Sequence, residues 1–262
     1  MDDCTGFTCK CDEGFQTTVD GICVPIGEND HLPENWNELA EKAFASAYED
    51  PHFHISGRSA NQPDLCFDLD GEPLTGMLLL EDSLTGLSIE GELFTPKGQG
   101  KVYFSSFRLI TPFKIFVDIN IDGFRYNTHT LRRGQAVPKL SDEQVSTQFG
   151  DLIVGKIRKM PHGGRRATVK IESGPSLEIQ FVEKHRNVNI RIVDPEGISG
   201  EAKGILGTLI KPNSYQVQKL KENRGLLYYN GKMVGAKFQH HAWNDQCWYV
   251  SKRDAENLFG QK

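Results

Sequence analysis

Short segments in which apolar and polar residues alternate run through most of the chain from residue 53 onward. Alternation with a period of two is typical of strands that bury one face. Asp122-Gly123 and Asn230-Gly231, two dipeptides common in hairpin turns, separate some of these segments. The clearest expected strands span residues 87–93, 101–107, 114–121, 168–172, 177–182 and 188–193. Many strands without intervening helices predict an antiparallel β-sandwich or a related mainly β domain.

A different pattern comes before the strands. Between Pro33 and Tyr48, apolar residues recur at the three- and four-residue spacing of an amphipathic helix, and Pro33 suits a first helical turn. These apolar positions are Trp36, Leu39, Ala40, Ala43, Phe44 and Ala47. We therefore expect a linker helix that ends just before residue 50. A second, short helix is expected from Lys252 to Leu258.

Composition and charge narrow the class of protein. The 262 residues are 38% hydrophobic and 25% charged, as in an ordinary globular protein, and the net charge is −5. That charge argues against a dedicated nucleic-acid binder, which needs a concentrated positive surface. No apolar run is long enough to span a bilayer. The residues after Met1 do not form a signal peptide, and we interpret the chain as a piece of a longer secreted protein.

Four cysteines crowd the first 23 residues, and their density predicts a small disulfide framework in an oxidising compartment. The spacing from Cys9 to Cys23 resembles the second half of an EGF-like module. This resemblance implies the pair Cys11–Cys23 and leaves Cys4–Cys9 as the other pair. A zinc site is the alternative, although the single-residue gap between Cys9 and Cys11 is not the usual zinc-ligand spacing.

The bond between Asp50 and Pro51 carries the most distinctive chemistry. The Asp50 carboxylate can attack its own backbone carbonyl carbon and close a five-membered anhydride, and a protonated proline nitrogen is a good leaving group. Histidine side chains in general suit the role of proton donor near neutral pH, and in an extended segment His52 shares a face with Asp50. The same sequence is also an ordinary entry into a strand, because a residue before proline avoids the α region.

Several motifs in order make the chain similar to the C-terminal region of the inter-alpha-trypsin inhibitor heavy chains, which resembles von Willebrand factor type D domains. The resemblance covers roughly residues 48–262. Its motifs are Asp50-Pro51-His52-Phe53, Leu65-Cys66-Phe67-Asp68-Leu69-Asp70-Gly71, residues 78–87, Gly204-Ile205-Leu206-Gly207 and Cys247-Trp248-Tyr249-Val250. The expected organisation is a partial EGF-like module over residues 1–24, a linker over 25–49 and a type D-like β domain over 50–262.

This resemblance implies processing at Asp50-Pro51. In that family the Asp becomes a new C-terminus that is esterified to chondroitin sulfate, the downstream part leaves as a propeptide, and the heavy chain can be passed to hyaluronan. Two features depart from the family. Glu49 stands where the family has Gly, which places a second carboxylate beside Asp50. The von Willebrand type A domain that carries the ester is missing upstream, so processing stays a hypothesis.

The resemblance also implies a disulfide between Cys66 and Cys247, which are 181 residues apart. Closing so long a loop removes unfolded-state entropy worth roughly 4–5 kcal/mol in the chain-entropy model. Two separate buried thiols are the alternative.

A basic cluster flanks the turn at His162-Gly163-Gly164. Folded as a hairpin, it would concentrate positive charge on an acidic protein and could hold a sulfated glycosaminoglycan through charge-assisted hydrogen bonds. An outward-facing, solvated hairpin is the simpler interpretation. The members of this cluster are Lys156, Arg158, Lys159, Arg165, Arg166 and Lys170.

Two groups of carboxylates alternate along expected strands and offer oxygen ligands that suit calcium. They are Asp68 with Asp70, and Asp118 with Asp122. Neither group has the full spacing of a known calcium loop, and polar faces at the ends of strands are the simpler interpretation. No cofactor is required by any motif.

No serine nucleophile elbow, phosphate-binding loop, dinucleotide fingerprint or His-Glu-X-X-His motif occurs in the sequence. A multiple-turnover enzyme is therefore not expected. The sequence predicts a secreted module of the extracellular matrix or fluid that acts by binding and assembly, with hyaluronan, chondroitin sulfate or matrix proteins as partners. The alternative is a self-processing domain that cleaves Asp50-Pro51 and transfers the new end to a glycosaminoglycan hydroxyl.

Overall fold

The computed structural model describes residues 15–17, 23–25, 44–48, 51–96, 100–128, 147–149, 151–155, 157–160, 164–240 and 246–260. The chain divides into two units, Met1–Pro33 and Glu34–Lys262. In the first unit, strands β1 (Phe15–Thr17) and β2 (Cys23–Pro25) pair antiparallel. Cys4, Cys9 and Cys11 lie outside the described residues, so the pairs Cys4–Cys9 and Cys11–Cys23 and the EGF-like resemblance stay predictions.

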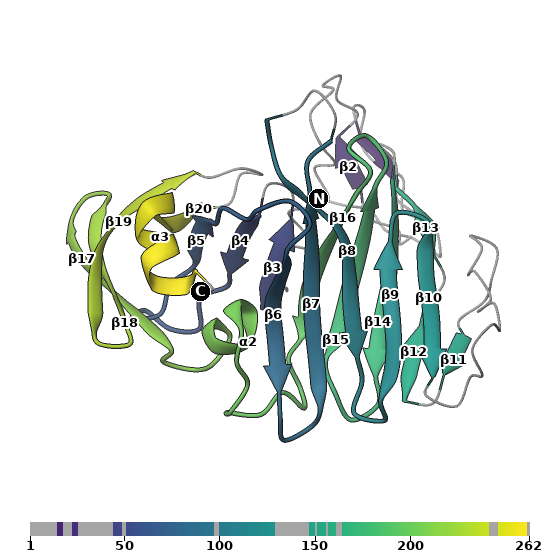
Figure 1. Ribbon diagram of the computed structural model, residues 1–262. Helices are drawn as coiled ribbons and strands as arrows, with labels where there is room; N and C mark the ends of the chain where they lie inside the picture. The colour runs from purple at the N-terminus through teal and green to yellow at the C-terminus, as the bar shows by residue number, and fades with distance from the viewer. Residues whose placement is uncertain are drawn as a thin grey trace, which may run out of the picture. The chain divides into compact units, whose positions relative to one another are not determined.

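The second unit is a two-layer β structure, which confirms the predicted mainly β sandwich (Figure 1). One layer is a five-stranded antiparallel sheet in the order β10-β9-β8-β7-β6. Its strands are β6 (Gly76–Asp82), β7 (Leu87–Phe94), β8 (Tyr103–Ile110), β9 (Ile115–Asn120) and β10 (Gly123–Thr128). The hairpin predicted at Asp122-Gly123 joins β9 to β10.

The other layer is a 13-stranded sheet in the order β11-β12-β14-β15-β16-β3-β4-β5-β20-β19-β18-β17, with β13 paired to β14 beside this path. Only the pair β20–β5 is parallel among the described strands. The strands of one half are β11 (Thr147–Phe149), β12 (Leu152–Val154), β13 (Arg158–Lys159), β14 (Arg165–Ile171), β15 (Ser176–Val182) and β16 (Asn187–Asp194). Those of the other half are β3 (Ala45–Tyr48), β4 (His52–Ile55), β5 (Leu65–Asp68), β17 (Tyr215–Lys221), β18 (Arg224–Tyr229), β19 (Lys232–His240) and β20 (Gln246–Val250).

The predicted linker helix is wrong at its C-terminal end. Ala45–Tyr48 is a strand, β3, which lies between β16 and β4 in the middle of the large sheet. Ala45 and Ala47 are fully buried on the core side, and Ser46 and Tyr48 are buried on the other side. Helix propensities differ by only about 0.7 kcal/mol per residue among ordinary residues, so pairing with two neighbours and burial of both faces outweigh them. Residues 33–43 of the predicted helix lie outside the described residues.

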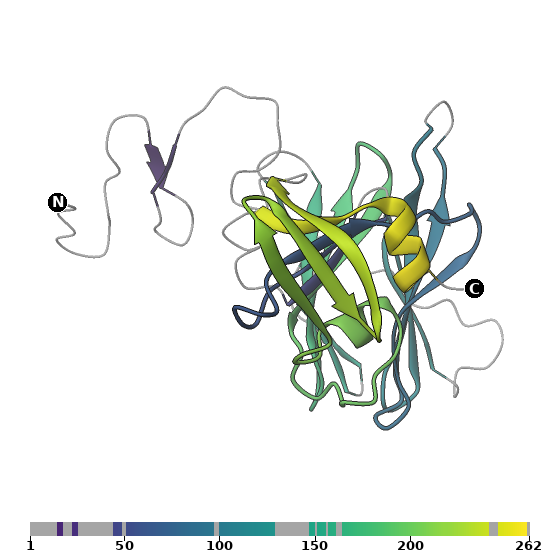
Figure 2. The same cartoon turned by 90° about the vertical axis from the view of Figure 1, so that its left-hand side faces the viewer.

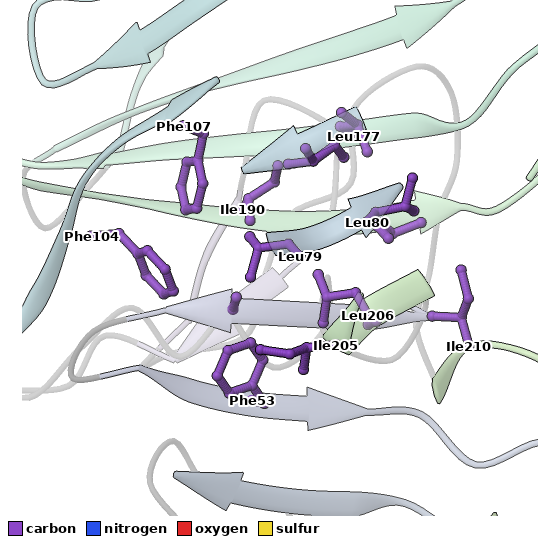
Figure 3. Close-up of a cluster of buried hydrophobic side chains, with 14 of the residues drawn as sticks. Phe53, Leu79, Leu80, Phe104, Phe107, Leu177, Ile190, Ile205, Leu206 and Ile210 are labelled. Carbon is purple, nitrogen blue, oxygen red and sulfur yellow. The ribbon is translucent and has the colours of Figure 1, made fainter. Parts of the chain in front are cut away.

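The core lies between the two sheets and is closed at one end by a short helix, α2 (Ile205–Leu209) (Figure 3). Phe53 of β4 meets Phe104 of β8 edge-on, with ring centroids 6.5 Å apart. Leu79 and Leu80 of β6 are fully buried next to α2. The chain enters this helix through Gly204 at φ 82°, where a Cβ atom would stand 2.7 Å from the Leu79 carbonyl oxygen. Only glycine, which has no Cβ atom, allows the two backbones to come this close.

The C-terminal helix, α3 (Lys252–Phe259), confirms the helix expected from Lys252. The side chain of Ser251 caps it by accepting from the Asp254 N–H. Phe259 packs against Phe67 of β5 at 4.5 Å and against Tyr229 of β18 at 4.9 Å between ring centroids. Figure 2 shows α3 beside β17, β18 and β19. The Asn230-Gly231 turn between β18 and β19 has positive φ at both residues, as its sequence predicts.

Asp82, at the end of β6, is a fully buried carboxylate that fixes the loop before α2. One oxygen accepts from the Ser199 N–H at 2.7 Å, and the other from the Ser199 hydroxyl at 2.8 Å and the Leu84 N–H at 3.1 Å. Burial by itself would raise the pKa of Asp82, but the bonds from Ser199 and Leu84 outweigh it and lower the pKa. The carboxylate is therefore ionised in the folded protein.

We expect Asp82→Asn to lower the free energy of unfolding at pH 7 by about 1–3 kcal/mol, because buried donors lose a charged acceptor. A lowered folded-state pKa gives stability that is present above the unfolded-state value of about 3.9 and is lost as the pH falls through the folded pKa. The difference between parent and variant should therefore shrink below about pH 4. Urea unfolding of both proteins at pH 7 and pH 3 measures it, and an undiminished difference at pH 3 would contradict the assignment.

Candidate functional site

The Asp50-Pro51 bond lies between two strands at the centre of the large sheet. Tyr48, the last residue of β3, pairs with His52, the first residue of β4, so the strands are joined by residues 49–51. Pro51 is buried, and its carbonyl oxygen accepts a hydrogen bond from the Leu69 N–H at 3.0 Å. Glu49 and Asp50 lie outside the described residues, so the predicted common face of Asp50 and His52 stays a prediction.

His52 is 3% exposed and contacts a carboxylate. Its Nδ1 atom hydrogen-bonds to Oδ1 of Asp68, the residue directly opposite it on β5. The ring of Tyr48 meets the imidazole edge-on, with centroids 4.7 Å apart. With Asp68 ionised, its carboxylate can only accept hydrogen bonds, which assigns the shared proton to Nδ1 of His52. A proton that His52 exchanges with another group must then be carried by Nε2.

Asp68 has a second partner on β20. The hydroxyl of Tyr249 donates to Oδ2 of Asp68 at 3.1 Å. Burial, then the negative charge of Asp68 and this hydrogen bond, raise the pKa of Tyr249 to about 12. The Tyr249 hydroxyl therefore keeps its proton at any physiological pH and can donate a hydrogen bond. His52, Asp68 and Tyr249 form one connected group, which we call the imidazole–carboxylate site.

A disulfide borders this site. Cys66 and Cys247 are bonded, with Cα atoms 5.8 Å apart, as the family resemblance implies. Tyr249 is the register partner of Cys66 in the parallel pair β20–β5. Because alternate residues of a strand share a face, Asp68 and Tyr249 each follow a bonded cysteine by two positions on the same face. The disulfide thus ties the strand of Asp68 to the strand of Tyr249.

Sequence patterns did not find this group. Asp68 was a candidate calcium ligand, and Tyr249 had no assigned role. The available signal was the cysteine pair. When two bonded strands run parallel, the residues two positions after the two cysteines lie close together on one face. To use that signal one must know that β20 and β5 run parallel, and the sequence does not reveal their direction.

The residues of the predicted basic cluster are on two faces of the sheet. Arg158 is paired with Arg166, and Lys159 with Arg165, so each pair shares one face. Arg165 points to the five-stranded sheet, where it donates to the Ile121 carbonyl oxygen at 2.5 Å and covers the Phe181 ring at 5.3 Å. Lys156, His162 and Gly163 lie outside the described residues.

Arg158, Arg166 and Lys170 remain together on the other face, and Arg158 and Lys170 are exposed there. Arg166 lies 4.0 Å from Glu178, a buried carboxylate that Arg191 also contacts at 3.3 Å. Glu178 therefore neutralises part of the positive charge on this face. The surface available to an anion is smaller than the six-residue cluster of the sequence.

Three of the candidate calcium ligands, Asp68, Asp70 and Asp118, have other side-chain partners. Asp70 is ion-paired with Lys252, and Asp118 lies 3.3 Å from Arg108. Asn120 accepts from the Asp122 N–H at 2.9 Å. Within the described ranges, no group of three or more His, Cys, Asp or Glu side chains could hold a metal ion. Calcium binding at Asp68, Asp70, Asp118 or Asp122 therefore has no geometric support among these residues.

The fold is a mainly β sandwich with the imidazole–carboxylate site in its large sheet, and comparisons with known proteins indicate its relatives. No family model matches the chain. It is 28% identical to inter-alpha-trypsin inhibitor heavy chain H3 of Rattus norvegicus in an alignment of 184 positions that covers 64% of this chain and 19% of the relative. It is 26% identical to heavy chain H1 of Bos taurus in an alignment of 186 positions that covers 65% of this chain and 19% of the relative.

Heavy chain H1 of Homo sapiens is 23% identical in an alignment of 259 positions that covers 88% of this chain and 27% of the relative. These similarities support a relationship between this chain and the inter-alpha-trypsin inhibitor heavy chains. The chain spans only 19% to 27% of the length of these three relatives. In the described part of the chain, no helix has the length and apolar character needed to cross a membrane.

Proposed function

We propose that this chain is a module of a secreted protein that cleaves its own Asp50-Pro51 bond and thereby takes part in extracellular assembly. The observation that supports the proposal most is the contact between His52, one residue after the bond, and Asp68. A buried histidine that is oriented by a carboxylate is the usual arrangement of a proton-transfer group. Similarity to inter-alpha-trypsin inhibitor heavy chains supports the extracellular assembly role.

The reaction needs no external catalyst. A carboxylate oxygen of Asp50 attacks the Asp50 carbonyl carbon, and Nε2–H of protonated His52 gives its proton to the Pro51 nitrogen as the C–N bond breaks. The products are a cyclic anhydride at Asp50, a free Pro51 N-terminus and a neutral imidazole. Water then opens the anhydride to a C-terminal aspartic acid. A glycosaminoglycan hydroxyl in place of water would give an ester.

Cleavage is tested by the intact mass of the chain after incubation at mildly acidic pH. The parent should yield fragments that end at Asp50 and begin at Pro51. Asp50→Asn should keep the fold and give no cleavage, because an amide does not form the anhydride. His52→Ala should slow cleavage by about 10²–10⁴, the usual contribution of a positioned proton donor. Equal rates in the Asp50→Asn variant and the parent would identify external proteolysis.

Two further variants sharpen the test. Glu49→Gly should speed cleavage, because it removes the second carboxylate and frees the backbone before Asp50. His54→Ala is the matched control: His54 is buried on the same face of β4 but lies two residues farther from the bond. A control as slow as His52→Ala would show that loss of packing, not loss of a proton donor, determines the rate.

The fold predicts what becomes of the cleaved chain. Strand β3 lies upstream of the bond, yet it is paired with β16 on one side and β4 on the other. The N–H of Phe44 also donates to the Ile192 carbonyl oxygen at 2.8 Å, and its carbonyl oxygen accepts from Ser56 at 3.1 Å. Breaking the chain at Asp50 removes none of these bonds.

We therefore expect the fragments 1–50 and 51–262 to elute together in size-exclusion chromatography under native conditions and to separate only in denaturant. The expected observation is one native peak and two bands in a denaturing gel. Separate native peaks would contradict the central position of β3. The uncleaved Asp50→Asn variant serves as the size reference.

A second candidate function, binding of a sulfated glycosaminoglycan, is favoured by the common face of Arg158, Arg166 and Lys170. Replacing all three by Ser should weaken binding to a chondroitin sulfate column and lower the salt concentration that elutes the protein, because such contacts are screened by salt. Lys219, Lys221 and Arg224, exposed at the β17–β18 hairpin, give a control variant with the same charge change. Loss of binding in the control alone would contradict this assignment.

A further inference from the structure

We propose that Asp68 and Tyr249 are positioning residues that hold the imidazole of His52 in the orientation and tautomer required to protonate the Pro51 nitrogen. This inference rests on the self-cleavage proposed above and extends it to two residues that are distant from the bond in sequence. Neither side chain reacts; each acts through His52.

The sheet fixes the contact between His52 and Asp68. The two residues are direct partners in the antiparallel pair β4–β5, so their Cβ atoms lie side by side on one face. The same strand region also holds the backbone, because Leu69, the residue after Asp68, donates its N–H to the Pro51 carbonyl oxygen. Residues 68 and 69 thus hold both the side chain of His52 and the main chain of Pro51.

The chemistry of the contact determines the tautomer. Asp68 accepts from Nδ1, so the proton that leaves His52 must be the one on Nε2. A carboxylate at Nδ1 also stabilises the imidazolium by its charge, as in catalytic His–carboxylate pairs in general. Replacing the carboxylate by an amide introduces a donor at this position, which permits the opposite tautomer and removes the charge.

Tyr249 holds the carboxylate in turn. Its hydroxyl donates to Oδ2 of Asp68 at 3.1 Å, which leaves Oδ1 for His52. The raised pKa of Tyr249 keeps this hydroxyl protonated. The disulfide between Cys66 and Cys247 then keeps β20 beside β5, so Tyr249 stays next to Asp68.

A second histidine–carboxylate pair provides a matched control. Nε2 of His54 lies 3.5 Å from Asp64 on the same face of the sheet, but it is farther from the bond. Asp64 also accepts from the Gly57 N–H at 2.6 Å. Burial opposes its charge, yet the hydrogen bonds from His54 and Gly57 lower the pKa of Asp64. Asp64→Asn therefore removes a carboxylate that faces a histidine of the same strand, through a longer and more exposed contact, without touching His52.

The experiment measures self-cleavage rates of the full chain by intact mass, together with thermal unfolding midpoints. We expect Asp68→Asn to slow cleavage by about 10², and by no more than His52→Ala does. Tyr249→Phe should slow it by roughly five-fold, the net effect of one hydrogen bond. Asp64→Asn should cleave at the parental rate. The double variant His52→Ala/Asp68→Asn should cleave no more slowly than His52→Ala alone, because Asp68 acts only through His52.

A spectroscopic measurement covers the case in which Asp68→Asn does not fold. In the uncleavable Asp50→Asn protein, nitrogen-15 shifts of neutral His52 should show the proton on Nδ1, and Tyr249→Phe should reduce the population of that tautomer. A proton found on Nε2 alone would overturn the inference.

The outcomes separate the two proposals. A parental rate in Asp68→Asn, with slow cleavage in His52→Ala, would overturn the positioning role and leave self-cleavage intact. Additive losses in the double variant would show a merely structural role and also overturn it. A parent that does not cleave at all would overturn self-cleavage and, with it, this inference.

Discussion

The pairing of β3 with β4 and of β4 with β5 is the constraint on which the rest of the structure depends. It places two short segments, on either side of Asp50-Pro51, at the centre of a 13-stranded sheet. Alternate residues then divide between the faces: Ala47, Phe53 and Phe67 enter the core, whereas Tyr48, His52 and Asp68 lie on the other face. A slip of one residue would exchange these sets, so the buried aromatic side chains fix the position of His52.

The parallel strand β20 extends this arrangement from the opposite end of the chain. It brings Tyr249 beside Asp68, and the disulfide of Cys66 and Cys247 makes the association covalent. The loop so closed contains most of the domain, and its closure is worth roughly 4–5 kcal/mol in the chain-entropy model. The same bond therefore stabilises the fold and maintains the imidazole–carboxylate site. The disulfide thus contributes both to the stability of the domain and to the order of the site.

The sequence was informative where structure depends on local patterns. Alternation predicted β7, β8, β9, β14, β15 and β16, and a helix expected over Lys252–Leu258 corresponds closely to α3. The sequence misled at Ala45–Tyr48, where alanine-rich helical spacing concealed a central strand. It could not reveal the role of Asp68 or Tyr249, because their contact with His52 depends on the pairing of strands far apart in the chain. In the sequence, Arg158 and Arg165 belong to one basic cluster, but strand pairing places their side chains on opposite faces of the sheet.

The resemblance to inter-alpha-trypsin inhibitor heavy chains and the geometry around His52 favour the same hypothesis from independent directions. The resemblance implies processing at an Asp-Pro bond, and the structure supplies a buried histidine, oriented by a carboxylate, one residue after that bond. Glu49 is the feature that most opposes the chemistry, since it places negative charge beside the attacking carboxylate. In the proposed mechanism, Glu49 lowers the rate of attack by the Asp50 carboxylate, and His52 supplies the proton to the Pro51 nitrogen.

Trapping of the intermediate tests the central claim most directly. If cleavage passes through an anhydride at Asp50, hydroxylamine present at mildly acidic pH will compete with water for it. Mass spectrometry should then find the fragment 1–50 with a hydroxamate at Asp50, in a fraction that rises with hydroxylamine concentration, alongside unmodified 51–262. Cleavage that gives only the free acid at every hydroxylamine concentration would contradict the anhydride, and with it the role assigned to Asp50.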